Sequence, residues 1–304
     1  MPFEVTILGN NSAIPAHGRH PTSQVVQIYE QYFLVDCGEG TQMQLTKYKV
    51  RKNKFDHIFI SHLHGDHYFG LIGLITSYHL MRREKPLHVY GPKGLLDIIN
   101  LQLAVSNTKL FYELIFHEVK SELVNVLLET EEFIISSFPV KHRIPTHGFL
   151  FKEKTGLRKI NPEKIEELNF PFQIITELKK GNDCEWEGKL LKSNEWTLPP
   201  TQPRSYAFCA DTIYHEELKK YIAGCDVIYH ESTFMEESSE RAIITFHSTA
   251  RQAASMGKAV GAKKLLIGHF SAKYDNLEPL LAEAKEIFKE TELAIEGNVF
   301  SIEK

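Results

Sequence analysis

Three histidines and one aspartate are crowded into six positions of the sequence, His62–His67. They follow an apolar run, which predicts a strand that ends at a loop. Imidazole nitrogens and carboxylate oxygens suit zinc, and also manganese or iron, so the ligand types do not choose among these metals. A lone histidine would favour a surface loop without a metal. The crowding of four such residues after a strand instead predicts a metal-binding loop.

The spacing inside this loop predicts two metal positions. His62 and His64 are two residues apart and can face one cation, while Asp66 and His67 can face a second cation beside it. Gly65 gives the tight loop the backbone freedom that it needs. Two metal ions about 3.5–4 Å apart can share one hydroxide, which attacks a phosphoryl or acyl centre. We therefore expect metal-assisted hydrolysis.

Two metal ions need further ligands from elsewhere in the chain. Three candidates each follow a short apolar run: His142 in FPVKHRIPTHGF, Asp211 in AFCADT and His269 in LLIGHFS. A carboxylate can bridge two cations, so Asp211 is the natural bridging ligand. Each residue alone could equally be structural. Their shared position after strands makes the set more specific than its members.

The elements that must position these residues alternate along the chain. Apolar patterns predict strands or strand hairpins at 3–9, 24–40, 57–61, 87–92, 112–119, 132–140, 205–212, 225–234 and 264–270. Helical spacing predicts helices at 40–48, 68–83, 93–104, 248–262 and 278–290. This mixture indicates an α/β protein with sheets packed between helices, in a single domain that spans 1–304.

A segment of about 152–203 interrupts that regularity. It is polar and weakly periodic, and we expect no clear core face within it. The segment holds the basic pairs Arg158–Lys159 and Lys179–Lys180, but about as many acidic residues as basic ones. We interpret it as an insertion into the domain.

The composition limits the partners of this chain. The 304 residues are 42% hydrophobic and 24% charged, and the net charge of −4 gives no global signature of nucleic-acid binding. A nucleic acid would need a local basic patch. We find no signal peptide and no apolar run of about 18 residues, so we expect a cytoplasmic protein without a membrane partner. The four cysteines form no CxxC pair, which favours free thiols.

The motif SHLHGDH, together with His142, Asp211 and His269, resembles the metallo-β-lactamase superfamily over nearly the whole chain. Within it, the chain resembles ribonuclease Z, the family of tRNA 3′-processing endoribonucleases. Four features carry the narrower resemblance: LGNNSAIPAHGRHPTS near the start, HRIPTHGF, YHESTF followed by FHSTA, and the insertion between His142 and Asp211.

The resemblance implies an αββα sandwich, called α/β or α+β by different schemes, with a two-metal site at one edge of the sheets. It implies two Zn²⁺ per subunit, with Mn²⁺ or Fe²⁺ as alternatives, and no organic cofactor. The implied substrate is precursor tRNA, cut to a tRNA with a 3′-hydroxyl and a trailer with a 5′-phosphate. A homodimer is also implied, in which the inserted arm of one subunit clamps tRNA above the active site of the other.

The resemblance also implies a role for each candidate ligand. His62, His64 and His142 would bind one zinc. Asp66, His67 and His269 would bind the other, and Asp211 would bridge the two. Asp66 would in addition orient or deprotonate the attacking water.

Two further residues have roles only through the resemblance. His247, in FHSTA, would donate a proton to the leaving 3′-oxygen, helped by Glu231 in YHESTF. The alternative is structural, since His247 precedes a predicted helix and Glu231 could be a capping or solvated carboxylate. His230 could hold a ligand in place.

Two basic clusters are candidates for RNA contact. The ends of the arm could present Lys152, Lys154, Arg158 and Lys159 together, or these could belong to a solvated insertion. The run KYKVRKNK, Lys47–Lys54, could touch the acceptor stem or be a solvated turn.

Two other classes of enzyme compete with the endoribonuclease. A small-molecule phosphodiesterase, lactonase or thioester hydrolase could use the same metal loop, but such enzymes generally lack the long arm and the HEST and HST motifs. A di-iron oxidoreductase would require a glutamate in place of His64 and a flavin-binding domain, and this chain has neither.

Overall fold

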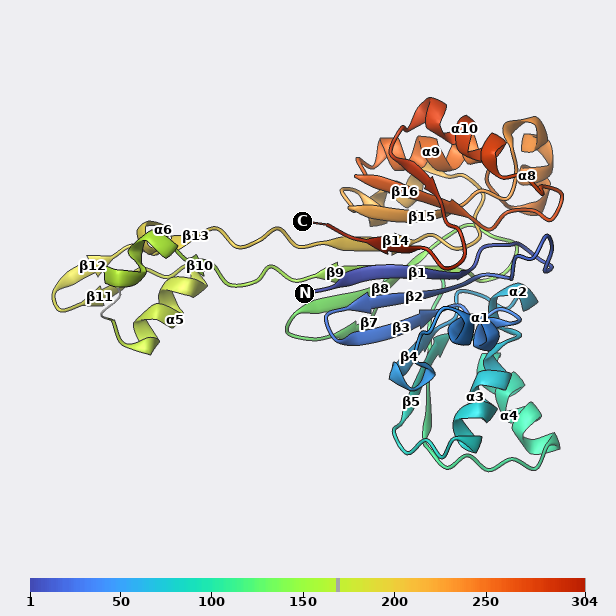
Figure 1. The fold of residues 1–304 in the computed structure, drawn as a ribbon, viewed down its shortest axis with the longest axis horizontal. Helices are drawn as coiled ribbons and strands as arrows, with labels where there is room; N and C mark the ends of the chain where they lie inside the picture. The colour runs from blue at the N-terminus through green and yellow to red at the C-terminus, as the bar shows by residue number, and fades with distance from the viewer. Residues whose placement is uncertain (168–169, 304) are drawn as a thin grey trace.

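Two mixed sheets packed face to face form the centre of the protein (Figure 1). The computed structural model describes residues 1–167 and 170–303. The first sheet has the order β18-β1-β2-β3-β4-β5-β6, with bounds Val299–Ser301, Phe3–Gly9, Ser23–Ile28, Gln31–Val35, Phe55–Phe59, Leu87–Gly91 and Leu114–Glu118. The second has the order β17-β16-β15-β14-β9-β8-β7, with bounds Thr291–Leu293, Lys264–Gly268, Val227–Glu231, Ser205–Phe208, His147–Glu153, Phe133–Pro139 and Asn125–Glu129.

Helices cover the outer face of each sheet, which gives four layers. Figure 1 shows α3 and α4 against one sheet and α9 and α10 against the other. The helices of the first side are α1 (Thr41–Lys47), α2 (Gly65–Tyr68), α3 (Leu71–Leu80) and α4 (Leu95–Val105). Those of the second side are α7 (Lys219–Ile222), α8 (Ser239–Thr245), α9 (Ala250–Ala259) and α10 (Glu278–Ile287). The predicted sandwich with helices outside is therefore confirmed.

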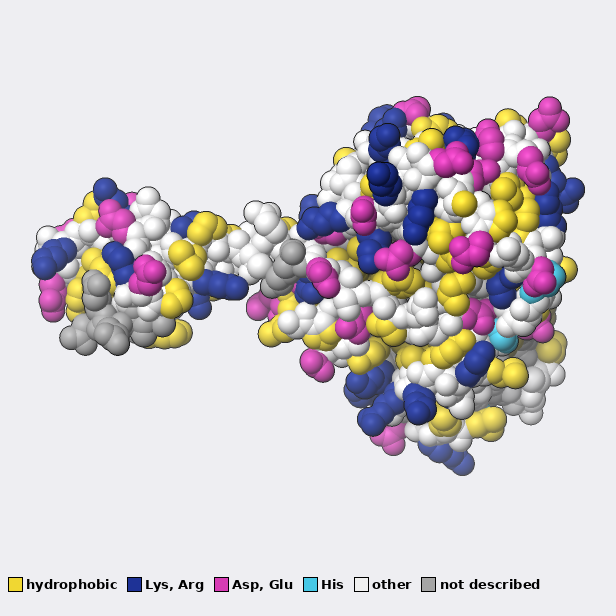
Figure 2. Space-filling view, turned by 45° about the horizontal axis from the view of Figure 1, so that its top comes forward, with side chains coloured by type: hydrophobic (Ala, Val, Ile, Leu, Met, Phe, Trp, Pro, Cys, Tyr) yellow, Lys and Arg dark blue, Asp and Glu magenta, His cyan; other side chains and the backbone are white. Residues whose placement is uncertain are grey.

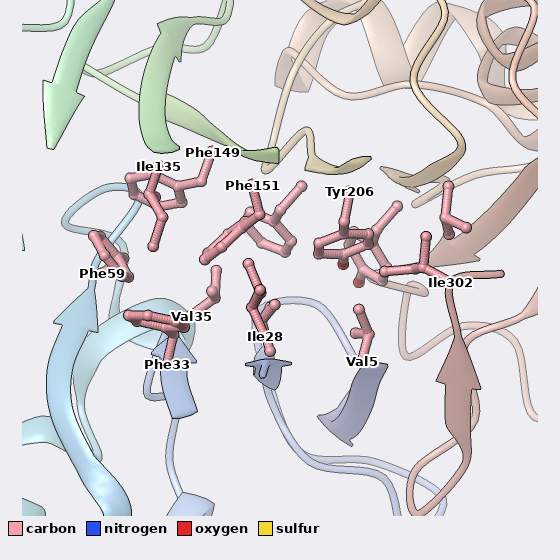
Figure 3. Packing of buried hydrophobic residues seen from close by; sticks show 14 of the residues in the cluster. Val5, Ile28, Phe33, Val35, Phe59, Ile135, Phe149, Phe151, Tyr206 and Ile302 are labelled. Atoms are coloured by element: carbon pink, nitrogen blue, oxygen red, sulfur yellow. The ribbon is translucent and has the colours of Figure 1, made fainter. Parts of the chain in front are cut away.

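An aromatic core fills the space between the sheets (Figure 3). The ring of Phe33 lies 6.0 Å from that of Phe59 in its own sheet and 5.9 Å from that of Phe151 in the facing sheet. Large rings exclude water over much area for few residues, and tilted contacts of this kind add to that stabilisation. The two sheets are thereby held in one relative position.

The direction of the strands brings the predicted site together. β3 to β6 run parallel, and β14 to β17 run parallel in the other sheet. β8 is antiparallel to β9, which is antiparallel to β14, so β8 and β14 point the same way. Loops that follow β4, β8, β14 and β16 therefore meet at one edge of the sandwich.

Several elements differ from the sequence prediction. The helix expected at 68–83 is shorter, because α3 spans only Leu71–Leu80 and Tyr68 ends the separate helix α2. Outside the arm, the strands β7, β9, β17 and β18 and the helices α2, α7 and α8 were not predicted. In β9, five of the seven residues are buried. A strand covered on both faces loses the alternation of apolar and polar residues that would identify it.

The arm folds into a small lobe of its own, contrary to the expectation that it has no core face. It contains β10 (Lys159–Ile160), η2 (Pro162–Glu167), α5 (Phe172–Lys180), β11 (Cys184–Trp186), β12 (Lys189–Leu191), α6 (Ser193–Trp196) and β13 (Thr197–Leu198). Leu178 and Leu191 are buried in this lobe. Its elements are too short to show a period in the sequence. Residues 168–169, within the predicted insertion, lie outside the described residues.

Two other expectations can be compared with the structure. All four cysteines are free thiols, as predicted. In the part of the chain that the structure describes, no helix has both the length and the apolar character to cross a bilayer.

A buried ion pair ties the arm to the core. Glu153 ends β9, where the chain leaves for the arm, and Arg204 immediately precedes β14, where it returns. The guanidinium donates to both carboxylate oxygens, at 2.6 and 3.0 Å. It also donates to the carbonyls of Met1 and Ile302, at 3.0 and 3.1 Å. One side chain thus joins both stems of the arm to both ends of the chain.

We expect Arg204→Ala to lower the free energy of unfolding by about 3–5 kcal/mol, because it leaves the Glu153 carboxylate buried without its partner. Urea denaturation measures this loss. Arg251→Ala is the matched control, since Arg251 pairs with Glu286 where both side chains are exposed, and it should cost about 1 kcal/mol or less. Equal losses for the two variants would contradict the importance of the buried pair.

Candidate metal centre

The first group of predicted ligands lies around one small space. The Nδ1 atom of His64 is 3.0 Å from Nε2 of His62 and 3.1 Å from Nε2 of His142. The Oδ2 atom of Asp211 is 3.6 Å from the same His62 nitrogen. All four potential ligand atoms lie within 4.8 Å of one another. Three imidazole nitrogens and one carboxylate oxygen form a donor set that zinc prefers.

The second group lies beside the first. The Nε2 atom of His67 is 3.5 Å from Oδ2 of Asp66 and 3.4 Å from Oδ1 of Asp211. The Nε2 atom of His269 is 3.2 Å from that Asp211 oxygen and 3.3 Å from Oδ2 of Asp66. Two imidazoles and two carboxylates therefore surround a second position.

Asp211 belongs to both groups, with one oxygen toward each. Its carboxylate is almost fully buried. Among the described residues, its Oδ1 atom and Nε2 of His67 have no hydrogen-bond partner. Buried polar atoms nearly always have one, so these atoms fit cations as their partners. The structure brings together all seven predicted ligands, and their binding of metal remains a prediction.

Left-handed backbone conformations orient the side chains of two candidate ligands. His269 follows β16 with φ of +60°, and Ala210 precedes Asp211 with φ of +42°. Such left-handed conformations are costly for residues other than glycine and cluster at functional sites. The turns that they make direct the side chains of His269 and Asp211 into the same space.

Three of the candidate ligand rings are each held by a hydrogen bond at the far nitrogen. The Nδ1 atoms of His67, His269 and His142 lie 2.6 Å from Asp36 Oδ2, 2.9 Å from Thr233 Oγ1 and 2.9 Å from the carbonyl of Phe246. Contacts of this kind fix the ring and leave the other nitrogen for a metal. Burial lowers the pKa of His142 to about 4, so its ring is neutral and can coordinate.

Asp36 contacts the candidate ligand His67 and was not predicted from the sequence. It is fully buried and accepts hydrogen bonds from the backbone nitrogen and the hydroxyl of Ser61, at 2.7 and 2.8 Å. It follows β3, the parallel neighbour of β4, with φ of +55°. The sequence feature that could have indicated this contact is a carboxylate directly after a buried strand. Only the pairing of β3 with β4 places it under the metal loop.

His247 and Glu231 form a pair beside the second ligand group. The Oε1 atom of Glu231 is 2.8 Å from Nδ1 of His247 and accepts a hydrogen bond from the backbone of Ser248. Its Oε2 atom accepts two hydrogen bonds from Thr233. Burial lowers the pKa of His247, but the Glu231 carboxylate outweighs it and the net pKa rises to about 9. His247 therefore carries a proton at neutral pH.

The geometry narrows the alternatives for Glu231. It is fully buried, so the solvated alternative is wrong. Ser248, whose backbone nitrogen donates to Glu231, lies just before α9. The N-cap of α9 is Thr249, which forms a capping box with Gln252. Glu231 thus supports the start of the helix and holds His247 at the same time. His230 points elsewhere, with its Nδ1 atom 2.7 Å from the carbonyl of Glu231.

A cavity of about 440 Å³ opens onto the metal centre. Asp66, His247 and His269 line it, together with Arg143 and Arg241. These two arginines were not predicted from the sequence. Guanidinium groups suit phosphate oxygens, which they can bind with two parallel hydrogen bonds. Predicted ligands, the protonated His247 and the two positively charged arginine side chains thus line one cavity.

The predicted arm residues lie away from this cavity. Arg158 donates to Thr197 within the lobe, at 2.6 Å, and Lys154 pairs with Glu129 at 2.5 Å. Lys152 and Lys159 are exposed. Figure 1 shows that the arm leaves the core at the end opposite α2, which includes Asp66 and His67. Substrate binding by these four residues remains a prediction.

This fold and this edge cluster define the class of the protein. The structure matches that of the metallo-β-lactamase fold protein YhfI from Bacillus subtilis with a TM-score of 0.69 and 19% identity, over 99% of each chain. It matches the crystal structure of the short form of human tRNase Z with a TM-score of 0.72 and 26% identity, over 99% of this chain and 100% of that one. The protein therefore has the metallo-β-lactamase fold, as expected.

Comparison of sequences identifies the family. The chain is 41% identical over 301 residues to ribonuclease Z of Bacteroides fragilis, which covers 99% of both proteins. A family model described as anti-Pycsar protein Apyc1 matches residues 3–175, which end inside the arm. The chain belongs to the ribonuclease Z family, and the resemblance drawn from its motifs is confirmed.

We expect Asp36→Asn to weaken metal binding by about 10- to 100-fold, because the amide cannot hold His67 as the carboxylate does. Metal content after dialysis against a weak chelator measures the effect. Asp56→Asn is the control, since Asp56 is partly exposed and pairs with Arg83. Equal metal retention in both variants would show that Asp36 does not support the centre.

Proposed function

We propose that this protein removes the 3′ trailer from precursor tRNA by zinc-dependent hydrolysis, leaving a 3′-hydroxyl on the tRNA and a 5′-phosphate on the trailer. Its family makes the chain a tRNA 3′-processing endoribonuclease, as predicted. The observation that carries the finer proposal is the position of the His247–Glu231 pair. His247 lines the same cavity as Asp66 and His269, beside two ligand groups that share Asp211, and the buried Glu231 contacts it from behind.

The proposed metal ions are held by His62, His64, His142 and Asp211 on one side, and by Asp66, His67, His269 and Asp211 on the other. When bound, two such ions supply a nucleophilic hydroxide and neutralise charge on the phosphate. Burial raises the pKa of Asp66, but His67 and His269 outweigh it and hold the carboxylate ionised. Asp66 can therefore orient the attacking water or accept its proton.

His247 serves the other side of the reaction. The 3′-oxygen of the tRNA leaves as an alkoxide, a poor leaving group that requires a proton. The contact with Glu231 keeps the ring protonated and aims it into the cavity. Arg143 and Arg241 line the same cavity and can bind the phosphates beside the one that reacts.

The arm and a second subunit complete the proposal. We propose a cytoplasmic homodimer in which the lobe at 159–198 binds the tRNA body. The alternative function is hydrolysis of a small phosphodiester, which needs the same metal centre but no arm.

We expect replacement of residues 157–198 by a short Gly-Ser linker to abolish cleavage of a 3′-extended precursor tRNA and to spare hydrolysis of bis(p-nitrophenyl) phosphate. The reason is that the lobe lies far from the metal centre and can affect only a large substrate. Gel analysis of the RNA and absorbance of p-nitrophenol measure the two activities of the zinc-loaded protein. A wild-type protein that hydrolyses only the small ester would favour the alternative function.

We expect His247→Ala to lower kcat for precursor tRNA by about 10²- to 10⁴-fold, the usual contribution of a general acid. Hydrolysis of bis(p-nitrophenyl) phosphate should change much less, because p-nitrophenolate leaves without a proton. His117→Ala, on the edge strand β6, is the control, and metal content should stay unchanged in both. Equal losses on the two substrates would mean that His247 does not protonate the leaving group.

A further inference from the structure

A second basic surface, which the proposed function does not use, lies on the first sheet's side of the core. It combines two segments that are distant in the sequence. The run Lys47–Lys54 has no acidic residue, and the run Arg82–Lys85 has a single one, Glu84. We call the following seven residues the basic rim: Lys47, Lys49, Arg51, Lys52, Lys54, Arg82 and Lys85.

Part of the basic rim lines a cavity that the fold forms. The cavity has a volume of about 690 Å³, and Arg51, Lys52, Arg82 and Lys85 are among its lining residues. Tyr78, at the end of α3, donates from its hydroxyl to the carbonyl of Lys52 at 2.6 Å. This hydrogen bond joins the two segments of the rim.

The buried side chain of Arg83 stabilises the backbone beside this cavity. Its side chain is only 7% exposed, pairs with Asp56 at 2.6 Å and donates to the carbonyls of Phe55 and Pro86. Its guanidinium lies 5.0 Å from the ring centre of Tyr78. Because Arg83 is used internally, it positions the rim and is not counted within it.

The charges of the basic rim are available to a ligand. All its members except the half-buried Lys52 are exposed, and no ion pair involves any of them among the described residues. Lys54 lies 4.2 Å from the ring centre of Tyr32, and Arg82 lies 4.0 Å from that of Phe111. These contacts hold the cations in place without neutralising them. Positive charges gathered in this way, without ion-pair partners, create a positive potential that attracts an anion.

The basic rim is separate from the metal centre. Residues 52–54 precede β4, whereas the metal loop follows it. The five residues of β4 rise by about 3.3 Å each, so roughly 15 Å separate the two places. Figure 2 shows Lys and Arg side chains gathered on the core below the connection to the arm. The rim thus lies at the end of the core from which the arm projects (Figure 1).

We propose that the basic rim binds the phosphate backbone of RNA, as a contact distinct from both the metal centre and the arm. Lys47, Lys49 and Lys54 are exposed and do not line the cavity, so the charge of the rim extends beyond a site for one compact anion. Phosphate contacts of this kind add affinity without reading sequence. The inference rests on the proposed function in one respect, that RNA is the substrate.

The test compares two triple variants with equal changes in charge. In the rim variant, Arg51→Gln, Lys52→Gln and Lys85→Gln are combined. In the control variant, Lys258→Gln, Lys285→Gln and Lys289→Gln remove three exposed lysines from the helical layer of the other sheet. Fluorescence anisotropy gives Kd for a precursor tRNA over a range of salt concentrations. Thermal unfolding checks that both variants fold.

We expect the rim variant to bind the tRNA about 10-fold more weakly, with a salt dependence of log Kd lowered by about 2 to 3, since each lost phosphate contact lowers the slope by about 0.9. The control variant should behave as the wild type. Hydrolysis of bis(p-nitrophenyl) phosphate should be unchanged in both. Equal loss of affinity in the two variants would overturn the proposal, because it would reflect net charge alone.

A free phosphorylated ligand offers the same chemistry as an RNA backbone, and tripolyphosphate tests for it. If wild-type protein binds tripolyphosphate, the rim variant does not, and RNA affinity is the same in both, the rim is a small-anion site and the proposal is wrong. The anisotropy experiment measures RNA binding, and its result does not depend on whether the RNA is cut. A protein that binds tRNA through the rim but does not cut it would therefore contradict the proposed function and leave this inference standing.

Discussion

The shared carboxylate of Asp211 is the constraint on which the rest of the site depends. Its two oxygens face two separate groups of imidazoles, at 3.6 Å from His62 and 3.2 Å from His269. These residues follow strands in different sheets, so the carboxylate can serve both only if the sheets keep one relative position. The aromatic core between the sheets provides that position, since close-packed rings resist sliding. Packing far from the metal centre therefore decides its geometry.

Burying this many ionisable groups is costly unless each has a partner. The structure meets that cost in two ways. The far nitrogens of three ligand rings lie within hydrogen-bond distance of Asp36, Thr233 and the carbonyl of Phe246. The near nitrogens of these rings and the Asp211 oxygens face the proposed cations. Burial lowers the pKa of His62 and His142, which favours neutral rings that can coordinate a metal. At His247 burial acts in the same direction, but the Glu231 carboxylate outweighs it and raises the pKa to about 9. The same buried environment thus gives different protonation states to rings that lie close together.

The candidate metal centre and the arm lie at opposite ends of the sandwich (Figure 1). A chain with a net charge of −4 must gather its cations locally if it is to hold RNA. The basic rim is one place where the described residues gather cations away from the candidate metal centre, whereas the arm carries about as many acidic residues as basic ones. A long substrate can span these distances, whereas a small ester cannot.

The sequence by itself determined the ligand types and their places after strands, because a crowded motif such as SHLHGDH and short apolar runs are local features. It also determined the family, through motifs that identity over the whole chain confirms. Tertiary structure alone decided that Asp36 lies under His67, that Arg143 and Arg241 line the cavity, and that Lys52 and Lys85 border one surface. These are contacts between segments distant in the chain, set by strand pairing and helix packing. No local pattern records such contacts, because the energy that fixes them comes from the whole core.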